Sequence, residues 1–404
     1  MSQIVAESLV SRERPPPAAT GTDALTVTVH ADLAAAEPAW RALEARGVLT
    51  PYQRFDWVRH YCDAGFEDHA TLRIVELAAQ GTPFAILPLA IAPWMGAARG
   101  RVIGSDISNG DFIIMDRERA GLVTPAVLTE ALDAVRAGGT ALDMVLFANW
   151  PARWQGVDNP LLALPHALAP NTFYRVDLPE AKGGAFIEEA FPHKRRTNIR
   201  RSLRRLTEQF GELTLLRAKT PEEVERMHAV FLDQRARRFR QMGVENVFAR
   251  PPFQRLFLAA AKAELGKAQP ALSFHAVVAG GDTVLATSVG TYANGHYSQY
   301  INSTTDGPAS KYSLMGVLMA MLVDELRASG VTSLDMGLGD FDYKVDWTEP
   351  EPVHDSIIAV TPRGRVMARA LGAGRALKRG IKQNPAAWKL ARGAMSLKAK
   401  ISGR

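Results

Sequence analysis

The chain has 404 residues, of which 47% are hydrophobic and 22% are charged. This composition excludes collagen-like, low-complexity and wholly disordered chains, and the length indicates two domains or two halves of one unit. The single cysteine, Cys62, excludes a disulfide framework and a thiolate metal cluster.

Charge is distributed unevenly along the chain. Of the 48 basic and 42 acidic residues, 12 basic residues and no acidic ones lie from Arg363 to Arg404, which leaves 36 basic and 42 acidic residues in residues 1–362. The body is therefore mildly acidic, and residues 363–404 form a strongly basic tail.

The N-terminal segment predicts neither secretion nor membrane insertion. Residues 1–22 contain Pro15–Pro17 and no apolar core, so we expect a disordered leader instead of a signal peptide. The longest apolar stretch, Phe84–Ala98, is too short to span a bilayer and contains two prolines. We expect a cytoplasmic protein.

The apolar periodicity of residues 23–180 predicts a mixed α+β unit. Strands are expected at 25–30, 72–79, 84–91, 102–103, 112–115, 142–147 and 172–178, with helices at 33–46, 54–64 and 125–136. Gln80-Gly81-Thr82 is typical of a hairpin turn.

Residues 181–362 repeat the same order of elements. Thr220-Pro221-Glu222-Glu223 is a capping box with proline in the first turn, and it predicts a helix to about Arg240. Other helices are expected at 193–210, 252–265 and 314–329, with strands at 213–217, 272–279, 283–292, 296–302, 332–336 and 356–360. The simplest account is an α+β fold built twice, with a break between about Leu178 and Gly183.

The densest group of polar and aromatic residues lies in Tyr297–Trp347. It contains Lys311-Tyr312-Ser313 before a long helix, Asp335-Met336-Gly337-Leu338-Gly339-Asp340 at a strand end, and Tyr343-Lys344-Val345-Asp346-Trp347. With Pro51-Tyr52-Gln53 and the basic run 193–201, these motifs resemble the CelD-like family, linked to cellulose and exopolysaccharide biosynthesis, within the GNAT acetyltransferase superfamily. The resemblance covers most of residues 25–362.

The resemblance implies two GNAT-like halves, each with a mixed, mostly antiparallel sheet flanked by helices. It also implies transfer of an acyl group from acyl-CoA to an amine or hydroxyl of a small molecule, sugar or polysaccharide precursor. The expected acyl group is acetyl, with acetyl-CoA as donor, and another acyl-CoA is the alternative. Fem-type transferases share the superfamily. A Fem-like aminoacyl transferase using charged tRNA and a non-catalytic accessory of polysaccharide synthesis therefore stay open as alternatives.

Three residues are candidates for catalysis. Many GNAT enzymes carry a tyrosine after the corresponding strand to protonate the leaving thiolate, which here implies Tyr343. Asp340 and Asp335 flank a Gly-Leu-Gly segment, where a carboxylate can act as a general base or orient the acceptor. The alternatives are an aromatic packing role for Tyr343 and a structural hydrogen bond for Asp335, and Asp340 is favoured as the more exposed carboxylate.

The loop 303–313 is the expected cofactor site, because it leads into a helix N-terminus, where backbone N–H groups bind phosphates. Gly307, Lys311, Tyr312 and Ser313 are its candidate contacts. The usual GNAT pattern Q/R-x-x-G-x-G/A is absent, and an ordinary polar loop is the alternative.

Substrate contacts are expected from three cations, Lys344, Arg196 and Arg200. The two arginines belong to the helix 193–210, which carries seven cations around an apolar stripe. Such a surface suits a nucleotide-sugar diphosphate, cofactor phosphates or tRNA, and a solvated helix face is the alternative. We expect no DNA partner.

The remaining polar residues predict no metal site. The nine histidines show no metal-ligand spacing, and the lone His296 is more typical of a structural residue.

The tail carries a second amphipathic pattern. Helical spacing places Val366, Ala370, Ala373, Leu377 and Ile381 on one side. This pattern predicts peripheral association with the anionic inner face of the membrane, and a disordered basic tail is the alternative.

Overall fold

The computed structural model describes residues 25–384 and 386–387. The predicted leader 1–22 and the end of the basic tail, 388–404, lie outside the described residues.

The first part of the chain forms, in order, β1 (Leu25–His30), α1 (Leu33–Arg46), β2 (Gly47–Val48), η1 (Pro51–Gln53), α2 (Phe55–Asp63), β3 (Thr71–Ala79), β4 (Thr82–Trp94), β5 (Ala97–Val102), β6 (Ile114–Asp116), η2 (Ala120–Leu122), α3 (Pro125–Ala137), β7 (Met144–Pro151), β8 (Arg153–Trp154), β9 (Val157–Asp158), η3 (Pro160–Ala163) and β10 (His166–Asp177).

The second part repeats this alternation of helices and strands. Its elements are α4 (Phe186–Ala190), α5 (His193–Phe210), β11 (Leu213–Arg217), α6 (Pro221–Met242), η4 (Val247–Ala249), α7 (Pro251–Ala263), β12 (Ser273–Ala279), β13 (Thr283–Ala293), β14 (His296–Thr304), η5 (Pro308–Lys311), α8 (Leu314–Ala328), β15 (Ser333–Leu338), α9 (Asp342–Val345), β16 (Pro350–Ala359) and α10 (Pro362–Gln383).

Local sequence signals explain the best-predicted elements. Thr220 caps α6 by accepting a hydrogen bond from the Glu223 backbone N–H, with Pro221 in the first turn, as the capping box predicts. The predicted bounds of α5 and β11 are confirmed without change. In α5, Ile199 and Leu206 are buried, so its apolar stripe faces the protein.

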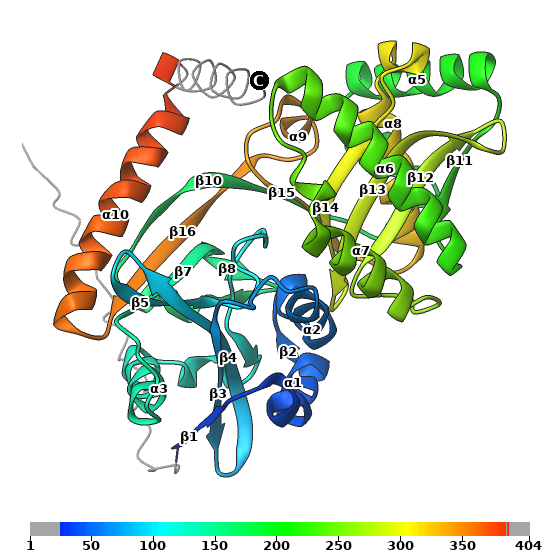
Figure 1. Ribbon diagram of the computed structural model, residues 1–404. Coiled ribbons are helices and arrows are strands. Elements are labelled where there is room, and N and C mark those ends of the chain that lie inside the picture. Colours follow the sequence, from blue (N-terminus) through cyan, green and yellow to red (C-terminus); the bar gives the residue numbers. More distant parts are fainter. Residues whose placement is uncertain (1–24, 385, 388–404) are drawn as a thin grey trace, which may run out of the picture.

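One mixed sheet of 14 strands runs through the molecule (Figure 1). Its main path has the order β1-β3-β4-β5-β7-β16-β10-β15-β14-β13-β12-β11, and β2 and β6 pair beside β4. All neighbours are antiparallel except β5 with β7 and β14 with β15. This confirms the predicted α+β fold of two mostly antiparallel halves.

The two halves exchange their last strands in the middle of this sheet. β10 ends the first part of the chain, yet it pairs with β15, where Phe173 lies opposite Leu338. β16 ends the second part, yet it pairs with β7, where Ile357 lies opposite Leu146. The expected break near 178–183 therefore follows β10 along the chain, but it does not separate two closed units.

The apolar core also crosses between the halves. α2 packs on α7, and the ring of Phe66 meets Phe253 edge-on with centroids 5.0 Å apart. One continuous cluster joins Trp40 and Phe55 of the first half to Phe231 and Phe257 of the second. Separating the halves would expose this apolar surface.

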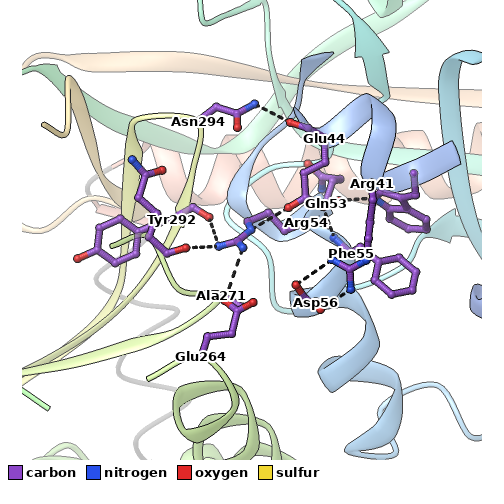
Figure 2. A network of polar contacts seen from close by, with 12 residues as sticks. Arg41, Glu44, Gln53, Arg54, Phe55, Asp56, Glu264, Ala271, Tyr292 and Asn294 are labelled. Carbon is purple, nitrogen blue, oxygen red and sulfur yellow. Dashed lines mark hydrogen bonds and ion pairs between the residues drawn. The ribbon is translucent and has the colours of Figure 1, made fainter. Parts of the chain in front are cut away.

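A buried arginine fastens the first half to the second (Figure 2). The Arg54 guanidinium donates to the backbone oxygens of Gln269, at 2.9 Å, and Tyr292, at 3.1 Å. It also forms ion pairs with Glu44, at 3.0 Å, and Glu264, at 3.5 Å. Glu44 belongs to the same half as Arg54, so docking of the second half adds Glu264 and the two backbone oxygens to a pair already present within the first half.

We expect residues 23–180 expressed alone to lack a cooperative fold, because β10 and β7 would lose β15 and β16. A thermal melt followed by circular dichroism checks this, and co-expression with residues 181–404 should restore a soluble complex. Cooperative unfolding of the isolated fragment would contradict it.

Candidate functional site

The candidate site lies where β14 and β15 diverge. The two strands pair only from His296 opposite Ser333 to Ser298 opposite Asp335. Tyr300 then forms a bulge in β14, because Gln299 pairs with Gly290 while Ile301 pairs with Val289. A bulge bends a strand away from its neighbour, so the sheet opens at this point.

A cavity of about 670 Å³ occupies this opening. Its wall includes Gln299–Thr304 of β14, Met336–Leu338 of β15, Tyr343 and Lys344 at α9, and Arg235 of α6. Met315 of α8 and Asn109 of the first half also line it, so side chains from several layers converge on one space. This volume is in the usual range for a small-molecule site.

The corresponding opening in the first half is filled by its own chain. β5 and β7 pair in parallel only to Arg101 opposite Leu146. Beyond that point the Asp111 carboxylate accepts a hydrogen bond from the Ala148 backbone N–H at 2.6 Å, and Asp111 N donates to Ala148 O at 3.1 Å. The loop 103–113 thus occupies the space beside β7.

A buried polar cluster forms the floor between the two halves. Asp335 is 1% exposed and accepts from Ser298 Oγ at 2.9 Å and from Asn109 Nδ2 at 3.3 Å, and its other oxygen lies 2.8 Å from His296 Nε2. Tyr52 Oη lies 2.7 Å from Ser298 Oγ and accepts from Asn109 Nδ2 at 2.7 Å. Burial raises the pKa of Tyr52 well above its usual value, and the nearby Asp335 raises it further.

The glycine after Asp335 is required by this cluster. Asp335 Oδ1 accepts from the Gly337 backbone N–H at 2.8 Å, and Gly337 has φ of +70°. A β-carbon there would lie 2.7 Å from the Asn109 side chain. Both the left-handed backbone and the close approach exclude larger residues. The expected structural hydrogen bond of Asp335 is present, and this carboxylate lies beneath the cavity floor.

Tyr343 and Lys344 are the two sequence-predicted site residues in the cavity wall. Lys344 is buried, and its Nζ donates to the backbone oxygens of Gly337, at 3.2 Å, and Leu338, at 2.9 Å. Burial lowers the pKa of Lys344 to about 8, although Asp335 and Asp340 oppose this shift. Burial raises the pKa of Tyr343, partly opposed by Asn302 and Arg235.

Arg235 is a site residue that sequence analysis missed. Its Nη1 donates to Asn302 O at 3.2 Å, and its guanidinium lies 4.3 Å from the Phe239 ring centroid. Its Nε is buried and has no hydrogen-bond partner among the residues that the structure describes. Burial lowers the pKa of Arg235 to about 10, and no carboxylate contributes to its shift. Arg238 also lines the cavity, whereas Arg237 between them points to Asp233 and Asp306.

The preferred carboxylate, Asp340, is exposed as expected but lies outside the cavity wall. Its Oδ1 accepts from Tyr174 Oη at 2.8 Å and from the Thr172 hydroxyl, both on β10. The turn formed by Gly337 and Gly339 directs Asp340 toward the exchanged strand. This geometry favours a structural role, and we do not include Asp340 in the mechanism.

The expected cofactor residues lie beside the cavity and not in its wall. The loop contributes Thr304, Thr305, Asp306 and Ser310, but not the predicted Gly307, Lys311, Tyr312 or Ser313. α5 covers this end of α8, because Tyr312 Oη donates to Gln209 at 2.9 Å and the Ser313 backbone N–H donates to Ser202 Oγ at 3.3 Å. Their contact with a cofactor remains a prediction.

The two predicted substrate arginines of α5 are engaged by α4. Arg200 Nε donates to Glu188 Oε1 at 2.6 Å, and Arg196 Nη1 donates to the Glu188 backbone oxygen at 3.2 Å. Neither lines the cavity between β14 and β15. Three other cations of α5, Lys194, Arg201 and Arg205, are exposed and form no ion pair within the described part of the chain.

His296 belongs to the same buried polar cluster, which agrees with the structural role that its sequence context favoured. It is buried between Ser333 Oγ, 2.7 Å from Nδ1, and Asp335. Strand alternation could have predicted this cluster from the sequence. His296 and Ser298 share one face of β14, and Ser333 and Asp335 share one face of β15.

Comparisons with known proteins agree with this geometry. Residues 193–345 match the family model described as acetyltransferase (GNAT) domain. The matched segment lies in the second half of the chain and contains β14, β15 and α9.

Solved structures extend the likeness to both halves. FemX is 11% identical with a TM-score of 0.60, over 85% of this chain and 100% of that chain. L-PGS from Bacillus licheniformis is 13% identical with a TM-score of 0.50, over 82% and 96%. A conserved protein of unknown function from Bacteroides thetaiotaomicron is 9% identical with a TM-score of 0.51, over 83% and 100%. At these identities the likeness concerns the fold. Among curated proteins, none matches the sequence.

We expect Asp335→Asn to destabilise the protein by about 1–3 kcal/mol, because the buried cluster would lose a charged acceptor shared by His296 and Ser298. Asp340→Asn is the matched control and should cost less than about 1 kcal/mol, because Asp340 is exposed. Urea unfolding of both variants measures the difference, and equal stabilities would contradict it.

Proposed function

We propose that the chain transfers an acyl group from acyl-CoA to an amine or hydroxyl of a small molecule, sugar or polysaccharide precursor, and that this acyl group is acetyl. The observation that carries the proposal is the cavity opened by the Tyr300 bulge, with Tyr343 and Lys344 in its wall. The GNAT match of residues 193–345 supports the reaction class.

The chemistry can be assigned to these two side chains. The acceptor nitrogen or oxygen attacks the thioester carbonyl carbon, and the carbonyl oxygen becomes an oxyanion. Two protons of the Lys344 ammonium are held by Gly337 O and Leu338 O, so the third is available to stabilise that oxyanion. The C–S bond then breaks, and Tyr343, kept protonated by burial, donates a proton to the leaving thiolate. The acceptor loses its proton to solvent, and the Tyr343 phenolate regains a proton from solvent before the next turnover.

We expect Tyr343→Phe to lower kcat about tenfold to a thousandfold without changing the fold, because a general acid typically contributes this much. Tyr312→Phe is the matched control, since its hydroxyl contacts Gln209 outside the cavity wall. Steady-state kinetics with acetyl-CoA would measure both. Equal rates for both variants would remove Tyr343 from the mechanism.

The rate should fall as pH rises through about 8, because the pKa of Lys344 is lowered to about 8 and its ammonium is lost above that value. Lys344→Arg should move this fall to higher pH, since a guanidinium stays charged. A pH–rate profile of both proteins tests this. A rate that rises through pH 8 would instead make the neutral amine the active form.

The cavity favours an acceptor that carries an acidic group. Arg235 is half-buried and forms no ion pair with a carboxylate among the described residues, and Arg238 and Lys344 add positive charge to the same wall. A phosphate or carboxylate placed beside Arg235 would pair with its guanidinium, and such charge-assisted hydrogen bonds contribute about 1.5–3 kcal/mol.

We expect Arg235→Gln to raise KM about tenfold to a hundredfold for acidic acceptors and to leave neutral ones unchanged. Amine acceptors in matched pairs, with and without a phosphate, provide the measurement with acetyl-CoA as donor. Arg237→Gln is the control, because Arg237 already pairs with Asp233 and Asp306. The same loss for both members of each pair would refute the acidic acceptor.

A second candidate function is aminoacyl transfer from charged tRNA. The exposed cations Lys194, Arg201 and Arg205 favour it, since they lie on one stripe of α5 and suit a phosphate backbone. Isothermal titration separates the donors. Binding of acetyl-CoA supports the first proposal, and binding of tRNA alone, lost in a triple glutamine variant of this stripe, supports the second.

A further inference from the structure

The C-terminal helix α10 lies beside β16 and β10 and is held there by one face (Figure 1). Arg375 Nη2 donates to Asp355 Oδ1 at 2.6 Å, and Lys382 Nζ donates to Asn171 Oδ1. At the start of the helix a β-carbon on Gly364 would lie 1.8 Å from the Asp143 backbone oxygen. Two side-chain contacts and one close backbone approach therefore fix which face of α10 meets the sheet.

The apolar stripe predicted from the sequence lies on the opposite face. Val366 is 64% exposed and Leu377 is 67% exposed, and the two alanines between them on this stripe are exposed as well. Val366 and Leu377 stand 11 residues apart, which is close to three full helical turns, so both point the same way. The protein's own core leaves this stripe uncovered.

Cations flank the uncovered stripe. Arg365, Arg369 and Lys378 are exposed, and none forms an ion pair with any residue in the ranges 25–384 and 386–387. No acidic residue occurs after Pro362, and the chain beyond α10 adds five more cations. A stripe of apolar side chains between basic ones matches the boundary between lipid headgroups and acyl chains.

We propose that the outer face of α10 docks on an anionic lipid surface. Charge complementarity selects this occupant, because residues 1–362 have a net charge of −6 and only the C-terminal part is uniformly basic. Within the described residues, no helix is long and apolar enough to cross a bilayer. Docking is therefore peripheral and reversible, with the helix lying in the plane of the interface. It does not depend on the acyltransferase activity.

Substitutions on the outer face provide the sharpest test. Removing α10 altogether would uncover β10 and β16 and leave Asp355 without Arg375, so a truncated chain reports on folding as well as on binding. The double variant Val366→Glu/Leu377→Glu changes two exposed side chains and leaves the inner face intact. Leu25→Glu is the control, because Leu25 is 38% exposed on β1, at one end of the strand order.

Co-sedimentation of the full chain with vesicles of phosphatidylcholine and phosphatidylserine measures docking. We expect the wild type and Leu25→Glu to bind and the double variant to bind at least about tenfold more weakly, since burying one leucine already contributes this factor. Binding should weaken as salt rises and vanish on pure phosphatidylcholine. Circular dichroism should show the same melting temperature for all three proteins.

Three results would overturn the proposal. The double variant binding anionic vesicles as tightly as the wild type would show that the stripe is not used. A lack of wild-type binding at low salt would exclude a lipid surface. The third result combines two observations: the wild type does not bind vesicles, and analytical ultracentrifugation shows it as a dimer while the double variant is a monomer. The stripe would then be covered by a second copy of the chain.

Discussion

The exchange of β10 and β16 is the constraint on which the candidate site depends. β15 forms one wall of the cavity, and β10, its antiparallel neighbour, comes from the first half. β14, the opposite wall, is held by β13 of the second half. The opening between the walls is therefore held by both halves at once, and neither half alone fixes its width. The Arg54 ion pairs and the shared aromatic core hold the halves in the same arrangement.

The two halves have the same topology but different uses for it. In the first half the opening beside β7 is closed by the loop 103–113, and that loop sends Asn109 across to the second half. Asn109 then contacts Asp335 and Tyr52 and also lines the cavity. At this position the first half supplies part of the cavity wall and a hydrogen-bond donor, both through Asn109. This explains why Gly337, which leaves room for Asn109, belongs to the same motif as Asp335.

Local signals made much of the fold predictable, and the failures share one cause. Capping at Thr220, the turn after Asp335 and the helical stripe of α5 depend on residues close in sequence, so their patterns were readable. Asp340 and Arg200 were misplaced because their partners, Tyr174 and Glu188, come from separate elements. Arg235 gave no signal, since an arginine on an amphipathic helix normally faces water, and only the tertiary packing of α6 over β14 buries it. The apolar stripe of α10 was readable from helical spacing, and the contacts of the helix with Asp355 and Asn171 turn that stripe outward.

Two cations in the cavity wall, Arg235 and Lys344, give the strongest indication of what the cavity is for. Transferring Arg235 and Lys344 out of water costs free energy, and their hydrogen bonds to backbone oxygens offset only part of this cost. A structural role would be served as well by apolar side chains of the same size. Arg237 on α6 pairs with Asp233 and Asp306, and Asp306 also lines the cavity. An anionic ligand or a developing oxyanion at the opening between β14 and β15 would add counter-charge beside Arg235 and Lys344, which supports the proposed function.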